Sequence, residues 1–137
     1  MSSLQSTTVL VGRILLGLIF VLSGFAKISG FDGTAGYIGS KGLPLPQLVA
    51  ALTIVVELGG GLALMAGLYT RQVVVVLAAF TLLAGVIFHN FWAVPQPDQM
   101  AQQINFMKNL SIAGGMLVLA AFGPGRLSLD ARRLASA

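Results

Sequence analysis

Residues 48–68 read LVAALTIVVELGGGLALMAGL, an apolar run in which Glu57 is the single charged residue. At a rise of about 1.5 Å per residue, a helix of this length crosses the roughly 30 Å of hydrocarbon in a bilayer. A carboxylate at the centre of such a helix costs ~2.5–3.5 kcal/mol on the insertion scale, so it usually faces a bundle interior or a cavity. The stretch therefore predicts a membrane-spanning helix, and Glu57 is the first candidate for a functional site.

The rest of the chain has a similar composition. Of its 137 residues, 56% are apolar and 9% are charged, whereas charged residues make up about a quarter of an ordinary soluble domain. Apolar segments of about 20 residues recur along it. We therefore expect an all-α membrane protein, a bundle of four transmembrane helices in a single domain over residues 1–137, with spans near 8–28, 48–69, 73–92 and 104–122.

The chain has no cysteine and one histidine. The lack of cysteine excludes disulfides, thiol exchange, iron–sulfur clusters and covalently attached haem, and one histidine excludes bis-histidine haem within a single chain. We expect no metal site. The net charge of +4 comes from scattered arginines and lysines rather than a dense basic run, so nucleic acid is not an expected partner.

Four spans would place both termini on one side of the membrane, together with the turn at residues 69–72. That side carries Arg71, Arg126, Arg132 and Arg133, with Arg13 one turn inside the first span, whereas the other side carries Lys27, Lys41 and Lys108. The positive-inside rule then predicts cytoplasmic termini. On this interpretation Arg13, Arg71 and Arg126 are topology anchors.

The first span has an alternative interpretation as a cleavable signal peptide, because Ile14–Phe25 is a short apolar stretch with small residues near its end. The spacing of its other residues argues against this. A single helical face carries Arg13, Gly17, Phe20, Gly24 and Lys27, which recur at intervals of three or four residues. Small residues on one face are typical of helix packing in membranes.

The connection at residues 29–47 is the longest on the outer side. Asp32 can cap a short helix over Thr34–Ser40, and Pro44 and Pro46 would end it before the second span. We therefore expect a short interfacial helix between spans one and two.

Spans two and four are similar to each other. A shift of 55 residues aligns Gly59-Gly60 with Gly114-Gly115 and Arg71 with Arg126, as a duplicated two-helix hairpin would. Chance similarity between apolar helices is the alternative, because spans one and three align poorly.

Several polar residues fall at membrane depth in the outer half of the bundle. Each has a structural explanation: a lysine can snorkel to the headgroups, a glutamate can fix helix packing through an ion pair, and a histidine can be a packing residue. Together they could bind a polar headgroup or relay protons. The candidates are Glu57, His89, Asn90, Lys108 and Asn109, and we expect Glu57 to pair with Lys108 or to hydrogen-bond His89.

Short motifs along nearly the whole chain, from about Val9 to Asp130, resemble the DoxX family of small bacterial inner-membrane proteins, and look most like its enterobacterial members. Each motif is short, and their order and spacing carry the specificity. They are GFDGT (30–34), GLPLP (42–46), VELGG (56–60), GLYTR (67–71), FHN (88–90), FMKNL (106–110) and GPGRLSLD (123–130).

The resemblance implies a four-helix protein of the bacterial inner membrane. The family takes its name from subunits associated with a quinol oxidase and a thiosulfate:quinone oxidoreductase, and most members have no established molecular activity. The polar positions typical of the family correspond here to Glu57, Arg71, His89, Lys108 and Asn109.

The leading hypothesis is a membrane subunit that binds a quinone or another lipophilic small molecule for a redox partner. The sequence has no self-contained catalytic motif, so at most we expect an accessory subunit of a quinone-linked oxidoreductase, with no covalent cofactor. The rival hypothesis is a structural or assembly protein whose polar cluster only fixes helix packing. Solute transport is weaker, because no span is broken by proline. The expected partners are the lipid bilayer, a redox protein and a second copy of the chain.

Overall fold

Helices make up most of the structure, a computed structural model that describes residues 2–136. The elements are α1 (Ser3–Ser29), α2 (Phe31–Ser40), α3 (Pro46–Ala66), α4 (Thr70–Phe88), the 3₁₀ helix η1 (Phe91–Ala93), α5 (Gln96–Phe122) and α6 (Leu129–Ala135). Four segments are long and apolar enough to cross a membrane: α1, α3, α4 together with η1, and α5. The predicted four-span, all-α fold is confirmed.

All four long helices begin before the predicted spans, and the difference is largest for α1 and α5. α1 begins at Ser3 because Ser2 and Gln5 form a capping box, in which each side chain accepts a hydrogen bond from the other residue's backbone N–H. α5 begins at Gln96 and has Pro97 in its first turn, where a proline removes no intrahelical hydrogen bond. Hydropathy marks the part of a helix that lies in hydrocarbon, whereas caps mark its ends.

The short helix between spans one and two is present as α2, but its predicted start and cap are wrong. The helix begins at Phe31, three residues before Thr34, and its N-cap is Gly30. Asp32 lies inside the first turn and makes no capping hydrogen bond. The chain turns directly at the end of α1, and Ala35 and Ile38 pack against Ala50 of α3, which holds α2 to the bundle.

The first hairpin consists of α1 and α3 in direct backbone contact. A Cβ atom added at Gly17 would lie 2.8 Å from the carbonyl oxygen of Gly61, and one added at Gly61 would lie 3.0 Å from that of Gly17. Small residues allow this approach, which drives helix association in lipid. The predicted packing face is confirmed at Arg13, Gly17, Phe20 and Gly24, all of which are buried.

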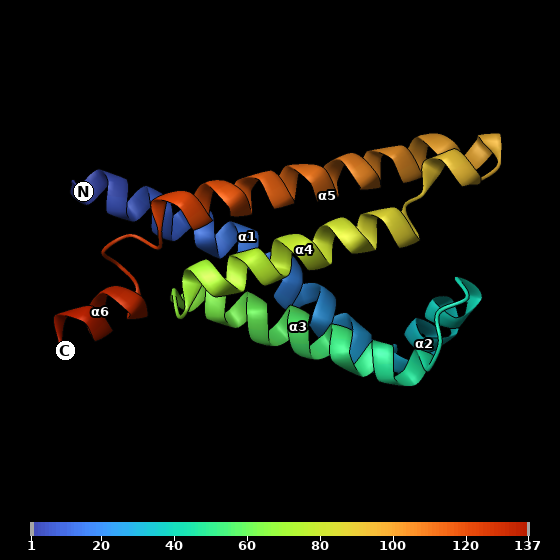
Figure 1. Ribbon diagram of the computed structural model, residues 1–137, viewed down its shortest axis with the longest axis horizontal. Helices are drawn as coiled ribbons and strands as arrows, with labels where there is room; N and C mark the ends of the chain where they lie inside the picture. Colours follow the sequence, from blue (N-terminus) through green and yellow to red (C-terminus); the bar gives the residue numbers. More distant parts are fainter. Residues whose placement is uncertain (1, 137) are drawn as a thin grey trace.

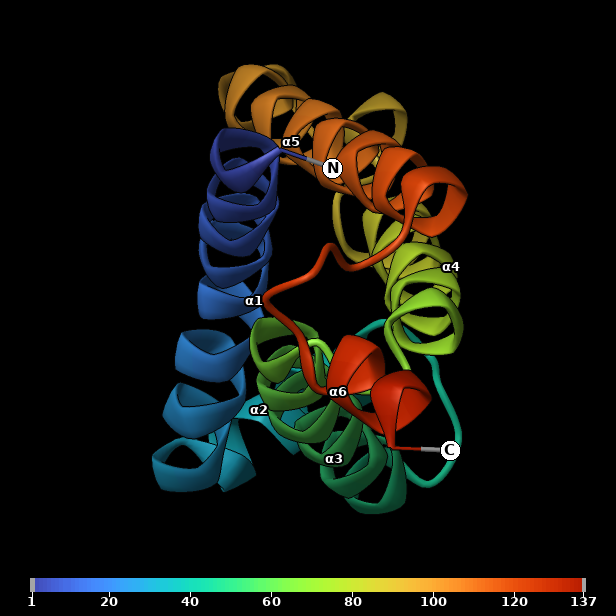
Figure 2. The same cartoon turned by 90° about the vertical axis from the view of Figure 1, so that its left-hand side faces the viewer.

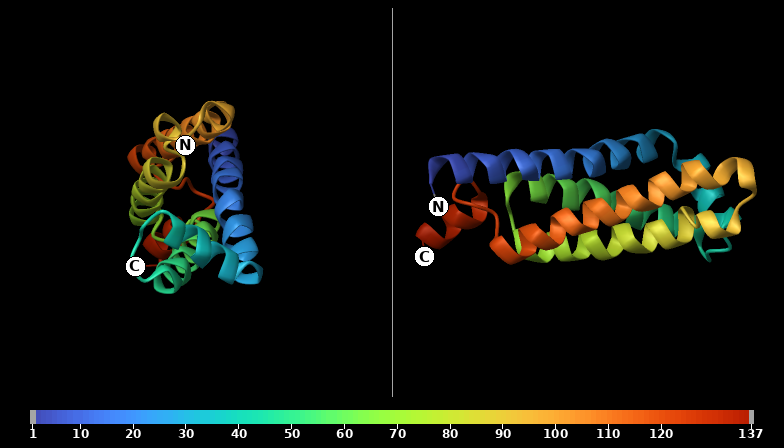
Figure 3. Two further views of the ribbon diagram at one scale, coloured as in Figure 1. Left: turned by 90° about the vertical axis from the view of Figure 1, so that its right-hand side faces the viewer. Right: turned by 90° about the horizontal axis from the view of Figure 1, so that it is seen from above.

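The second hairpin consists of α4 and α5, and the two hairpins lie side by side as two halves of the bundle (Figures 1 and 2). The start of α1, the α3–α4 turn and α6 share one end of the molecule, and α2 lies at the other end (Figures 1 and 3). This arrangement confirms the prediction that both ends of the chain lie on the same side of the bundle. Duplication of the hairpin stays a prediction.

The apolar core joins the hairpins near the end that carries α6. Leu64 of α3, Val74 and Leu77 of α4 and Met116 of α5 are fully buried there. Leu64, Val74 and Leu77 are close to the α3–α4 turn in sequence, and Met116 is close to the end of α5. The tightly packed half of the bundle is therefore the half nearest the chain ends, and the more polar half lies toward α2.

The segment before and within α6 crosses this end of the bundle and docks against it (Figure 2). The Asp130 carboxylate accepts hydrogen bonds from the backbone N–H groups of Tyr69 and Thr70, both at 2.8 Å. A carboxylate at the start of a helix suits its dipole, here that of α4. Arg13, which is 1% exposed, donates from Nη2 to the Leu127 carbonyl oxygen, so it holds this segment from inside the bundle.

Candidate functional site

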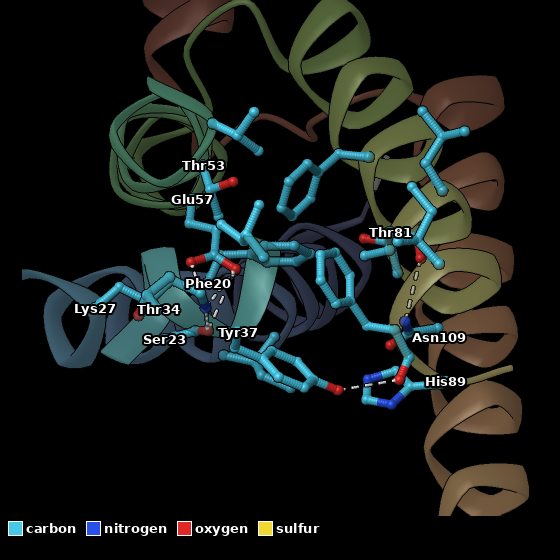
Figure 4. A pocket seen from close by; sticks show the side chains of 18 of the residues that line it. Phe20, Ser23, Lys27, Thr34, Tyr37, Thr53, Glu57, Thr81, His89 and Asn109 are labelled. Atoms are coloured by element: carbon cyan, nitrogen blue, oxygen red, sulfur yellow. Dashed lines mark hydrogen bonds and ion pairs between the residues drawn. The ribbon is translucent and has the colours of Figure 1, made fainter. Parts of the chain in front are cut away.

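A cavity of about 470 Å³ lies between the two hairpins, in the half of the bundle nearer α2 (Figure 4). Its volume falls within the range of about 300–1,000 Å³ typical of small-molecule sites. Most of its walls are aliphatic and aromatic, and polar side chains gather at two places. One polar end carries Ser23, Lys27 and Glu57, and the other carries Thr81, His89 and Asn109.

The first polar end is an ion pair between α1 and α3. Lys27 Nζ lies 2.9 Å from Glu57 Oε2 and donates a hydrogen bond to Oε1 at 3.1 Å. It also donates to Ser23 Oγ at 2.6 Å, and that hydroxyl donates to Glu57 Oε1 at 3.3 Å. The side chain of Glu57 is 8% exposed and that of Lys27 is 27% exposed. The carboxylate therefore lies inside the bundle, and its cationic partner reaches toward the surface.

Local helix geometry explains how these three groups meet. Ser23 and Lys27 are four residues apart, so they lie on the same face of α1. Gly24 lets that face approach α3, because a Cβ atom there would lie 3.2 Å from the Cβ of Glu57. Removing one partner of a buried ion pair leaves the other uncompensated, which destabilises more than the intact pair stabilises.

The second polar end lies between α4 and α5. Asn109 Nδ2 donates to the backbone carbonyl oxygen of Thr81 at 3.2 Å, and Gly85 leaves room for the amide. The Thr81 hydroxyl is buried, lines the cavity, and has no hydrogen-bond partner among residues 2–136. A buried hydroxyl without a partner is costly, so Thr81 is a group that a ligand could satisfy.

His89 closes this end beside α5. Its Nδ1 lies 2.8 Å from the Gln102 side-chain oxygen. An amide oxygen only accepts hydrogen bonds, so Nδ1 is the donor of this bond, and an imidazole that carries its single proton on Nδ1 has Nε2 as an acceptor. Tyr37 of α2 lies between the two polar ends, and its hydroxyl donates to the Phe88 carbonyl oxygen at 3.4 Å (Figure 4).

The structure brings together three of the five predicted site residues. Glu57, His89 and Asn109 line the cavity, whereas Asn90 and Lys108 do not. The Asn90 side-chain oxygen is buried without a hydrogen bond to any other described residue. Lys108 is exposed on α5 and faces a separate groove.

The expected pairing of Glu57 with Lys108 or His89 is wrong, because Lys27 is the partner of Glu57. α5 packs on α4 rather than on α3, so its side chains approach α4 first. Asn109 faces α4, and the residue before it in sequence points about 100° away around the helix. Lys108 is therefore directed outward.

Ser23, Thr81 and Tyr37 line the cavity, but they were not predicted from the sequence as site residues. Ser23 carried a signal, because it lies one helical turn before Lys27 on the same face. Thr81 sits in an apolar run with no neighbouring polar residue, so the sequence gives no sign that it faces a cavity. The described residues hold no group of three or more histidine, cysteine, aspartate or glutamate side chains that could bind a metal ion.

Comparison with known proteins identifies a matching family and several relatives. The sequence profile of the DoxX family matches residues 8–90. The chain belongs to the DoxX family. Inner membrane protein YphA of Escherichia coli K12 is 42% identical over 123 residues, which cover 90% of this chain and 88% of YphA. Inner membrane protein YqjF of the same organism is 41% identical over 130 residues, 95% of each chain.

A relative that matches a shorter stretch is "Putative oxidoreductase CatD" of Bacillus subtilis, 40% identical over 75 residues, 55% of this chain and 54% of CatD. No solved structure matches the chain. YphA and YqjF are inner membrane proteins by name, and this DoxX-family chain has four apolar spans. The chain is therefore a multi-pass membrane protein. The family predicted from its sequence is confirmed.

Proposed function

We propose that this DoxX-family protein is a subunit that binds a quinone or a similar lipophilic small molecule in the cavity between its hairpins and serves a redox partner. The cavity is the observation that carries the proposal. Its volume suits a small ligand, its walls are mostly apolar, and polar groups lie at two separate places. A site that only fixed helix packing would be expected to fill this space with side chains.

The chemistry of the two ends suits a ring with oxygen atoms on opposite edges. A quinone carbonyl accepts hydrogen bonds, and Lys27 and Thr81 are donors at opposite ends of the cavity. A quinol hydroxyl donates, and Glu57 and Nε2 of His89 are acceptors. The same cavity could therefore bind either form of the ligand. The electrons would come from a partner protein, because the chain supplies no redox group of its own.

Two further observations support the redox role and the position of the cavity in the membrane. The name of CatD contains the word oxidoreductase, although the match covers 55% of this chain. The arginines at the end of the bundle that carries α6 favour a cytoplasmic location for both termini, by the positive-inside rule. The cavity would then lie in the outer half of the bacterial inner membrane.

The rival function is structural. Lys27 and Glu57 tie α1 to α3 and satisfy each other, so the pair could serve only to fix the hairpin. In that case the cavity would hold lipid, and the protein would act as an assembly factor.

Mass spectrometry of small molecules that copurify with the detergent-extracted protein separates the two functions. We expect a quinone in reproducible amount with the wild-type protein and less of it with Glu57→Gln. Lipid alone in both preparations would support the structural function instead.

A further inference from the structure

A second hollow lies beside the cavity, on the outside of the bundle. It is a groove of about 610 Å³ between α1 and α5. Ile19 supplies the α1 side, and Gln103, Ile104, Met107, Lys108 and Ser111 supply much of the α5 side. Ile19 and Ile112 line both the groove and the cavity, so these two side chains form the wall between the two spaces.

The helix pairing explains why the bundle opens here. α1 packs on α3 and α5 packs on α4, and few residues of α1 and α5 approach each other. Ile19 is half exposed although it lines the cavity. The wall between the cavity and the lipid-facing surface is therefore loosely packed at the seam between α1 and α5.

We infer that the ligand is an amphiphile with one long apolar tail, and that its ring occupies the cavity while its tail passes between Ile19 and Ile112 into the α1–α5 groove. This inference rests on the proposed function and names the class of ligand. A lipid-soluble ligand could enter sideways from the bilayer without crossing water. The methylene groups of Lys108 can line the groove while its ammonium group reaches the headgroups.

The affinity of the wild-type protein for a tailed ligand would not show where the tail lies, because a groove that faces lipid is about as apolar as lipid itself. A bulky side chain placed in the groove does show the position of the tail, because it blocks the tail's path. A tail that must leave through a filled groove would have to fold into the cavity or distort the seam. Overpacking of this kind is destabilising, whereas a ligand without a tail would not meet the obstruction.

The test compares a methoxy-substituted benzoquinone with and without a decyl tail, in binding to purified protein. Ser111→Trp fills the groove at a residue that does not line the cavity. We expect it to weaken binding of the tailed quinone at least about tenfold, or ~1.4 kcal/mol, and to change binding of the tail-less one by less than about twofold. The matched control is Leu117→Trp, an exposed position on α5 that lines neither space.

Equal effects of Ser111→Trp on both quinones, or no effect on either, would overturn the inference and leave the proposed function in place. Failure of the wild-type protein to bind either quinone would overturn both. A photoreactive group at the end of the tail gives an independent readout. It should attach to α5 between Ile104 and Ser111, whereas attachment to α4 near Leu83, which is also exposed and lines the cavity, would place the exit elsewhere and refute the inference.

Discussion

At the scale of single residues, the ion pair of Lys27 with Glu57 is the most specific feature of the site. We predict that Glu57→Gln and Lys27→Met are not additive, because each leaves the other side chain uncompensated at low dielectric. The expected coupling is ~0.5–3 kcal/mol, the range for residues in contact. It would be measured by unfolding in detergent together with retention of the bound ligand.

Lys108→Met is the matched control for this cycle, since Lys108 faces the outer groove and lies outside the cavity. Its effect should add to that of Glu57→Gln within ~0.5 kcal/mol. Additive effects of Lys27→Met with Glu57→Gln would show that the pair does not form. Coupling in stability without coupling in ligand retention would favour the structural function.

The sequence predicted that Glu57 needs a partner, because a carboxylate in the middle of an apolar span is costly wherever it points. It could not predict which partner. Lys27 lies at the end of the predicted span one and Lys108 about one turn inside span four, and only the packing of α1 on α3 decides between them. The role of Arg13 is of the same kind, since its contact with Leu127 depends on where the chain returns after α5. The anchor role of Arg71 and Arg126 stays a prediction.

At the scale of helices, close contact of α1 with α3 is the basis of the first hairpin. We predict that Gly17→Ala destabilises the protein by about 1–3 kcal/mol, the usual cost of overpacking. The new Cβ would lie 2.5 Å from Met65 Cγ and 2.8 Å from the Gly61 carbonyl oxygen. Met65 can move, but the backbone oxygen moves only if the helices separate.

Thermal unfolding in detergent measures this effect, with Gly12→Ala as the control on the same helix. A Cβ at Gly12 meets nothing within 4 Å, so that variant should be as stable as the wild type or slightly more stable. Equal stability of both variants would mean that α1 and α3 are not packed at Gly17.

The docking of α6 should depend on pH through Asp130. Burial raises the pKa of Asp130, but hydrogen bonds from Thr70 and Tyr69 and the charge of Arg133 lower it more, so the pKa lies below its ordinary value of 3.8. A lowered pKa in the folded state means that the ionised carboxylate stabilises docking above the ordinary value. That stabilisation is lost as the pH falls through the lowered value.

Hydrogen exchange at the Tyr69 and Thr70 amides tests this prediction. Protection should be constant from neutral pH down to about pH 4 and fall below it. Asp130→Asn should reduce protection already at neutral pH, whereas Asp32→Asn, which alters an aspartate without a capping contact, should not. Unchanged protection in Asp130→Asn would show that the carboxylate does not hold α6.

The helices themselves were the most predictable part of the fold, because spans of about 20 apolar residues leave few alternatives. Their ends were less predictable. α5 extends back through the polar residues 96–103, which hydropathy cannot distinguish from a loop. The start of α2 at Phe31 depends on a turn at Gly30 that leaves no clear sequence pattern.

At the scale of the whole molecule, the arginines near the termini predict that both lie in the cytoplasm. A reporter that is active only in the cytoplasm, fused after Ala137, should give a signal. The same reporter inserted after Ser40, in the connection that carries α2, should be silent. The reverse pattern would invert the topology and move the cavity to the inner half of the membrane.

The cavity could not be predicted from the sequence, although three of its polar residues could. Its existence depends on two hairpins that pack together near Leu64, Leu77 and Met116 and leave space toward α2. That separation is set by the sizes of side chains from four helices at once, which no local pattern reveals.

Equilibrium binding of a tail-less benzoquinone measures directly whether this cavity binds a ligand. The binding is compared between the purified wild-type protein and two variants of α4. Ala84 lines the cavity, whereas Ala79 is exposed and does not. We expect saturable binding to one site in the wild type, at least about tenfold weaker binding in Ala84→Trp and unchanged binding in Ala79→Trp. Absence of saturable binding in the wild type, or equal binding by both folded variants, would contradict the claim that the cavity is a ligand site.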